Sequence, residues 1–115
     1  MSFKIHSKEK EKIGVITVEG EVDMFSSPKL RDKLVPFFEK KNKGIIVDLS
    51  GVSFMDSSGI ATLVEGLQWS KKENKQFILA GLGTNVMNAL SLTKLNTVFN
   101  IKTNAAAAFE ELRKF

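Results

Sequence analysis

Apolar and polar residues follow two different periods along this chain, and the changes of period mark its elements. Alternating and β-branched residues predict two short strands, at residues 3–7 and 13–18, joined by a polar turn at residues 10–12. A helical repeat then begins near Ser27, which we expect to cap a helix whose first position is Pro28. Pro36 lacks a backbone N–H and is expected to bend or break this helix, whose apolar stripe is Leu30, Leu34, Phe37 and Phe38.

The rest of the chain repeats a strand followed by a helix. Residues 45–49 are almost continuously apolar, which is typical of a strand buried on both faces, and residues 77–80 predict another. Helices are predicted after each strand, and a short edge strand near residue 101 precedes a last helix capped by Asn104. The inner side of that helix is predicted to be Ala105, Ala108, Phe109, Leu112 and Phe115.

The predicted order of elements is β-β-α-β-α-β-α-β-α. Strands that alternate with helices pair mostly in parallel, since each helix carries the chain back across the sheet. A length of 115 residues fits one compact domain. We therefore expect a single α/β domain over residues 1–115, with a mixed, mostly parallel sheet of four to five strands packed with four helices.

Composition removes several classes of protein. The chain has no cysteine, which excludes disulfides and thiolate metal sites. The first residues are too polar for a signal peptide and no apolar run approaches a membrane span, so we expect a cytoplasmic protein without membrane insertion. The net charge is +4, but arginine is scarce and tyrosine absent, so direct binding of nucleic acid is not expected.

Catalytic patterns are equally weak. His6 is the only histidine, and no Gly-x-Ser-x-Gly nucleophile elbow accompanies it. The four aspartates are too widely spaced to suggest a metal site. Gly81-Leu82-Gly83 resembles the start of a dinucleotide fingerprint, but Val86 occupies the third glycine position. We therefore expect no cofactor, no metal and no enzymatic activity.

The most informative stretch is the start of the helix after residues 45–49. Asp56, Ser57 and Ser58 are preferred helix caps, so their role is purely structural on one interpretation. On the other, Phe54 and Met55 anchor a surface turn, and Gly59 lets another chain approach the backbone. A phosphate on such a serine would be favoured by the free N–H groups and the dipole of the helix end.

The segment VDLSGVSFMDSSGIATLVEGL resembles the signature of the STAS domain family, specifically the bacterial anti-sigma factor antagonists. VEGEVDMFSSPKLRDKL upstream and KKENKQFILAGLGTNVMNALSLTKLNTVFNI downstream resemble further blocks of that family in the expected order. The resemblance thus covers nearly the whole chain. Ala61 and Lys94 depart from it, because glycine is common in relatives at these positions.

The resemblance implies a binding protein controlled by phosphorylation. In that family, an unphosphorylated antagonist binds and sequesters an anti-sigma factor, which is a serine kinase that uses ATP. Phosphorylation releases the antagonist, and a serine phosphatase restores it. The phosphorylated serine follows the motif aspartate and corresponds to Ser57, while Asp23, Asp56, Ser58 and Gly59 match the partner-binding surface. The alternative is a constitutive STAS scaffold or an accessory subunit of a membrane transporter or other signalling complex.

Overall fold

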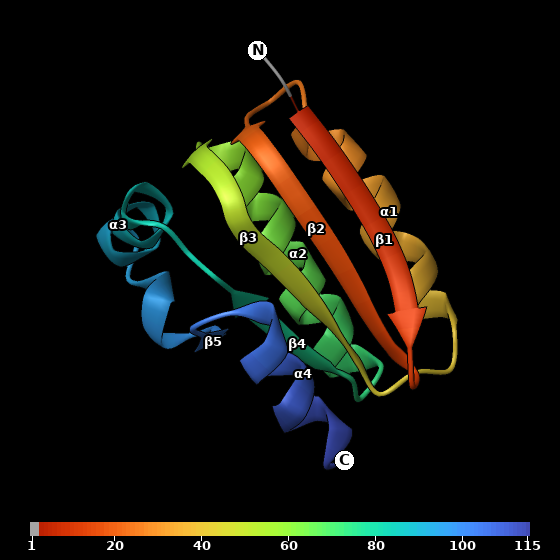
Figure 1. The fold of residues 1–115 in the computed structure, drawn as a ribbon. Helices are drawn as coiled ribbons and strands as arrows, with labels where there is room; N and C mark the ends of the chain where they lie inside the picture. The colour runs from red at the N-terminus through yellow and green to blue at the C-terminus, as the bar shows by residue number, and fades with distance from the viewer. Residues whose placement is uncertain (1–2) are drawn as a thin grey trace.

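The computed structural model describes residues 3–115, which form a five-stranded sheet with helices on both faces (Figure 1). The order β-β-α-β-α-β-α-β-α is the predicted one, with a short 3-10 turn, η1, added before the last strand. The elements are β1 (Phe3–Lys10), β2 (Ile13–Val22), α1 (Ser27–Glu39), β3 (Gly44–Met55), α2 (Ser57–Lys72), β4 (Gln76–Ala80), α3 (Thr84–Leu92), η1 (Leu95–Thr97), β5 (Asn100–Lys102) and α4 (Ala105–Arg113).

The strands lie in the order β1-β2-β3-β4-β5. Only β1 and β2 pair antiparallel, and the three other pairs are parallel, which confirms the predicted mixed sheet. Two shifts of register interrupt the pairing of β2 with β3, but the strands stay together until Val22 lies opposite Met55. The chain therefore leaves both strands at the same end of the sheet, where the loops to α1 and α2 begin.

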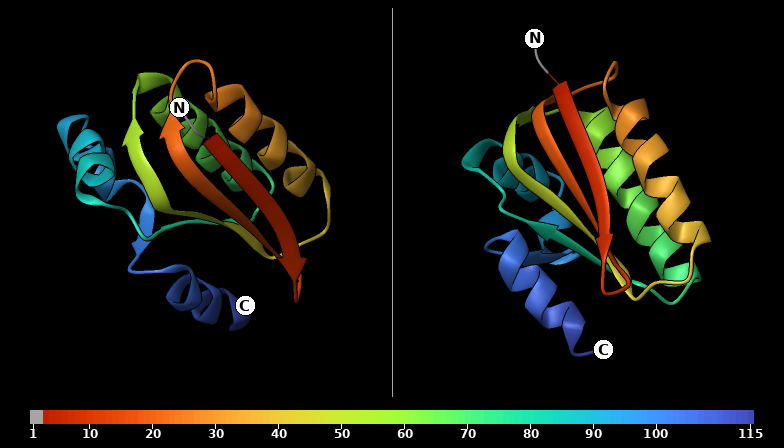
Figure 2. Two further views of the ribbon diagram at one scale, coloured as in Figure 1. Left: turned by 45° about the horizontal axis from the view of Figure 1, so that its top comes forward. Right: turned by 45° about the vertical axis from the view of Figure 1, so that its right-hand side comes forward.

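Two cores lie on opposite faces of the sheet. Helices α1 and α2 cover one face and α4 covers part of the other (Figure 2). The larger core lies under α1 and α2, where the ring of Phe38 stacks on Trp69 with centroids 5.0 Å apart. Alternate residues of β3 serve both cores, as expected for a central parallel strand: Ile45 packs into the larger one and Ile46 into the smaller.

The first helix differs from its prediction at its start. Ser26, not Ser27, is the N-cap residue, and its side chain bonds within the preceding turn instead of capping. Pro36 does not break the helix, since α1 continues to Glu39, as the apolar stripe beyond the proline indicated. Because Pro36 has no N–H, the carbonyl of Asp32 lacks its usual helical partner. Both residues are exposed. Water can satisfy that carbonyl, so the helix is not interrupted.

A lysine from a distant turn caps the end of α1. The Lys75 ammonium donates hydrogen bonds to the carbonyl oxygens of Phe37 at 2.8 Å, Phe38 at 3.1 Å and Lys40. Burial of this ammonium lowers the pKa of Lys75. The side-chain amide of Asn42 donates to the Phe37 carbonyl as well, at 2.7 Å. The last carbonyls of α1 are therefore satisfied by side chains and not by the helix itself.

The C-terminal part follows the prediction with one correction. Asn104 caps α4, its Oδ1 accepting from the N–H of Ala107 at 2.8 Å. Leu112 is fully buried, but Phe115 is 64% exposed and does not belong to the inner side of the helix. Lys94, just before η1, has a φ of +60°. This left-handed conformation costs a residue other than glycine about 1–2 kcal/mol.

Candidate functional site

Two loops meet at the carboxyl ends of β2 and β3. The N–H of Asp56, which follows β3, donates to the carbonyl of Val22 at the end of β2, at 3.1 Å. The loop that begins with Asp23 therefore lies beside the start of α2. Asp23 and Asp56 are 33 positions apart in the sequence, yet the parallel pairing of their strands brings their loops to one end of the molecule.

The carboxylate of Asp56 caps α2. Its Oδ1 accepts from the N–H of Ser58 at 2.9 Å, the Ser58 hydroxyl at 2.6 Å and the N–H of Gly59 at 3.2 Å. These hydrogen bonds, that of the Ser58 hydroxyl first, lower the pKa of Asp56 below its ordinary value. Asp56 is therefore ionised at neutral pH, and its own negative charge already occupies the anion-binding end of the helix.

The two serines after Asp56 have different environments. Ser57 is the first residue of α2 and is exposed, and its hydroxyl makes no hydrogen bond to any of residues 3–115. Ser58 is half-buried and donates its hydroxyl to Asp56. Of these two hydroxyls, only that of Ser57 is available to another molecule without loss of a hydrogen bond.

Asp23 organises the neighbouring turn. Its Oδ1 accepts from the N–H of Phe25 at 2.9 Å and of Ser26 at 3.0 Å. The Ser26 hydroxyl accepts from the N–H of Asp23 at 2.9 Å and donates to the carbonyl of Glu21 at 2.8 Å. This network fixes the backbone on both sides of Met24 and Phe25, so Asp23 positions its neighbours while it remains half-buried itself.

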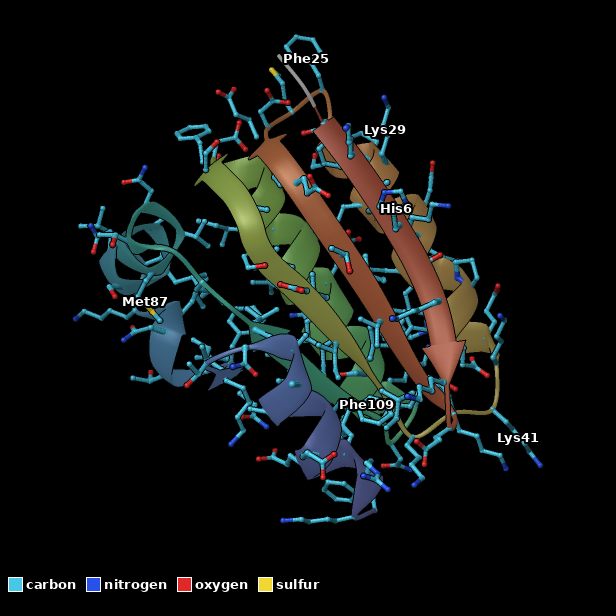
Figure 3. All side chains as sticks on the ribbon, viewed as in Figure 1. His6, Phe25, Lys29, Lys41, Met87 and Phe109 are labelled. Carbon is cyan, nitrogen blue, oxygen red and sulfur yellow. The ribbon has the colours of Figure 1, made fainter. Side chains whose placement is uncertain are left out.

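Three large apolar side chains are exposed at this end. Phe25 is 81% exposed, Met24 66% and Phe54 46%. Figure 3 shows Phe25 beyond the ends of the strands, pointing away from the sheet. No role was predicted for Met24 and Phe25, although two adjacent apolar residues between Asp23 and Ser26 cannot both face a core. Phe54 and Met55 were both predicted to anchor the turn, but only Met55 is buried.

Gly59 has a packing role within the domain that the sequence did not predict. It is buried, and a Cβ atom there would lie 2.7 Å from Met55 Cγ and 2.8 Å from Val22 Cγ1. The glycine therefore lets α2 approach the ends of β2 and β3 from within the domain. The predicted approach of another chain to this backbone stays a prediction, since the packing of Met55 and Val22 already requires a glycine here.

Residues that could support other chemistry lie elsewhere or are isolated. Within residues 3–115, no group of three or more His, Cys, Asp or Glu side chains is placed to hold a metal ion. His6 lies on the edge strand β1, opposite Thr17, and none of the described hydrogen bonds involves its ring. None of the helices described is long and apolar enough to span a membrane.

The fold and this site together define a class of small α/β domains. In this class, the polar first residues of a helix lie exposed at one end of a mixed sheet. A sequence model of the STAS domain matches residues 4–108, so the chain belongs to the STAS domain family.

Three relatives illustrate the family. The anti-sigma-B factor antagonist of Bacillus subtilis is 29% identical over 91% of this chain and 95% of its own length. An anti-sigma factor antagonist from Mycobacterium paratuberculosis has a similar structure, with a TM-score of 0.87 and 24% identity over 97% of this chain and 95% of that one. The structure of SpoIIAA in its unphosphorylated form is also similar, with a TM-score of 0.83 and 20% identity over 99% of this chain and 98% of that one. The phosphorylated form of SpoIIAA, a Bacillus cell fate determinant, has a TM-score of 0.75 and 19% identity over 96% of this chain and 99% of that one.

Proposed function

We propose that this chain is an anti-sigma factor antagonist switched by phosphorylation at Ser57. The unphosphorylated form binds and sequesters an anti-sigma factor that is itself a serine kinase, and phosphorylation releases it. The observation that carries this proposal is the free, exposed hydroxyl of Ser57 at the start of α2, beside the loop that exposes Met24 and Phe25. The likeness to anti-sigma-B factor antagonists along most of the chain supports it.

The exposed apolar side chains give the partner a surface to bury. Met24, Phe25 and Phe54 present apolar area that costs free energy while it faces water. Asp23 holds the first two in place through its turn, and Asp56 and Ser58 hold the start of α2. These three polar residues act in binding by positioning the surface, and Gly59 supports the same surface by letting α2 pack closely on the ends of β2 and β3.

A phosphate on Ser57 would change the charge of this surface at a helix start where two N–H groups are already engaged. The N–H groups of Ser58 and Gly59 already bind Asp56, so they are not free to bind a phosphate. The modification adds a charge of about −1.5 to −2 beside an ionised carboxylate. Like charges crowded at an interface disfavour association by several kcal/mol, on the order of what a binding switch requires.

The chain acts as a substrate in this scheme and not as an enzyme. The kinase supplies ATP and the catalytic groups, and Ser57 supplies the hydroxyl that accepts the phosphoryl group. A serine phosphatase completes the cycle, and all these steps take place in the cytoplasm. Neither DNA nor RNA contacts this chain directly.

Capture from the source cell tests the proposal. Wild type, Ser57→Ala, Ser57→Asp and Ser58→Ala would be used as bait, with bound proteins identified by mass spectrometry and then incubated with ATP. We expect wild type and Ser57→Ala to retain a serine kinase and Ser57→Asp to lose it. The kinase should phosphorylate wild type and Ser58→Ala but not Ser57→Ala.

Two results would contradict the switch. Equal capture of one kinase by Ser57→Ala and Ser57→Asp would show that charge at this position does not control binding. Equal capture of a transporter or another assembly by every variant would leave Ser57 as the first residue of a helix and favour the constitutive scaffold.

A further inference from the structure

A basic depression lies at the end of the molecule opposite Ser57. Three connections form it: the turn between β1 and β2, the loop between α1 and β3, and the turn between α2 and β4. Its volume is about 540 Å³. Lys41, in the loop between α1 and β3, and Phe25, in the loop that follows β2, lie at opposite ends of the sheet in Figure 3. The 12-residue strand β3 runs from this depression to Asp56.

Backbone hydrogen bonds tie the three connections together. The N–H of Lys43 donates to the carbonyl of Lys12 at 2.7 Å, and the N–H of Gln76 donates to the carbonyl of Lys43 at 3.1 Å. The lysines that line the depression are thus carried on a fixed frame and not on independent loops. They are Lys12, Lys40, Lys41, Lys43 and Lys75.

Positive charge is concentrated here. Five lysines and two glutamates, Glu39 and Glu73, line the depression, so its formal charge is +3, against +4 for the whole chain. None of the five lysines forms an ion pair within 4.0 Å in the part of the chain that the structure describes. No carboxylate of the described residues therefore binds these ammonium groups directly.

Two of the lysines are engaged with backbone carbonyls, and the others can face a ligand. Lys43 donates to the carbonyl of Arg113 at 3.3 Å. Lys75 is engaged with the last carbonyls of α1, where it offsets the negative end of that helix, so those carbonyls do not repel an anion. Lys40 lies with its ammonium 5.2 Å from the centre of the Phe37 ring. Lys12 and Lys41 are exposed and make no side-chain hydrogen bond to any of residues 3–115.

We propose that this depression binds a small ligand that carries two or more phosphate groups. Ammonium groups are compact charges that bind phosphate oxygens well, and a single phosphate cannot neutralise a charge of +3. The volume is within the range of small-molecule sites, about 300–1,000 Å³. Phe38, the only aromatic residue of the lining, is 2% exposed, so no ring is offered for a nucleic acid base to stack on.

Titration calorimetry at low salt with inorganic tripolyphosphate tests this proposal, with inorganic phosphate as the weaker ligand. Lys12→Gln/Lys41→Gln removes two charges from the depression, and Lys4→Gln/Lys33→Gln removes two exposed charges outside it. We expect the first double variant to weaken tripolyphosphate binding about tenfold or more and the control to weaken it less than threefold. Ser57→Asp should bind tripolyphosphate like wild type, so this result does not depend on the proposed switch.

A vesicle assay separates the two sources of such a ligand. Sedimentation with phosphatidylcholine vesicles, with and without phosphatidylinositol bisphosphate, would show whether the phosphates belong to a lipid headgroup. Binding of either probe that is lost in Lys12→Gln/Lys41→Gln and retained in the control supports the site. Absence of binding to both probes, or equal weakening in the two double variants, overturns it. Tighter binding of a single-stranded oligonucleotide than of tripolyphosphate overturns it in favour of nucleic acid.

Amide chemical shifts give a check that needs no variant. Tripolyphosphate added to isotope-labelled wild type should shift the signals of residues 11–13 and 39–44 and leave those of residues 54–59 unchanged. Shifts confined to the second group would contradict the proposed place of binding.

Discussion

The carboxylate of Asp56 accepts hydrogen bonds from both the backbone N–H and the hydroxyl of Ser58, at 2.9 and 2.6 Å. This pair, with the N–H of Gly59, fixes the start of α2. Asp56→Ala should therefore lower the free energy of unfolding by about 1–2 kcal/mol, measured by urea denaturation. Asp56→Asn keeps an acceptor of similar capping strength and should lose much less. Equal losses in the two variants would show that the charge, and not the cap, is what stabilises the helix.

The stability of the protein should depend on pH through the protonation of the Asp56 carboxylate. The pKa of Asp56 is lower in the folded protein than its ordinary value near ~3.9, so the unfolded state binds the proton more readily. The stability that Asp56 contributes is thus fully present above about pH 4 and is lost as the pH falls through the folded pKa. Denaturation of wild type and Asp56→Asn between pH 7 and pH 2 checks this. The stability difference between them should shrink with acid, and a constant difference would contradict the assignment.

The two serines should respond differently to the same substitution. Ser57→Ala removes a hydroxyl with no partner among the described residues and should change the free energy of unfolding by less than about 0.5 kcal/mol. Ser58→Ala removes a hydrogen bond to a carboxylate and should cost about 1 kcal/mol or more. Thermal or urea unfolding of both variants measures the contrast. A larger loss in Ser57→Ala would place its hydroxyl in the structural network instead.

Gly59→Ala should strain the packing of α2. The added methyl would lie 2.7 Å from Met55 Cγ and 2.8 Å from Val22 Cγ1, and the substitution should cost about 1–3 kcal/mol. Gly83→Ala is the matched control, since no atom lies within 4 Å of the Cβ position there. Urea denaturation of the pair separates the contact from the general effect of replacing glycine. If both variants lose the same stability, the close packing around Gly59 is not the cause.

Local rules were enough to predict the order of elements and several helix ends. The periodicity of apolar residues predicted all five strands and four helices. Cap preferences placed Asn104 correctly and restricted the start of α2 to Asp56, Ser57 or Ser58, of which Asp56 is the N-cap. These features depend on residues within a few positions of one another. The position of Ser57 at an exposed helix start follows from the same rules.

Features that depend on distant contacts were not predicted. The role of Gly59 is decided by Val22, 37 positions earlier, and the end of α1 is decided by Lys75. Pro36 is tolerated because it faces solvent, which periodicity alone does not weigh against the lost hydrogen bond. Met24 and Phe25 belong to a turn whose shape depends on the hydrogen bonds of Asp23.

The occupied end of α2 also bears on how long a phosphorylated molecule persists. A phosphoserine that folds back onto free helix amides is shielded, and its ester is hard for a hydrolase to reach. Here Asp56 holds the amides of Ser58 and Gly59, so a phosphate on Ser57 would be less shielded by its own helix. Under the proposed switch, its ester bond would therefore be open to a phosphatase, and the modified state would be short-lived wherever that enzyme is abundant.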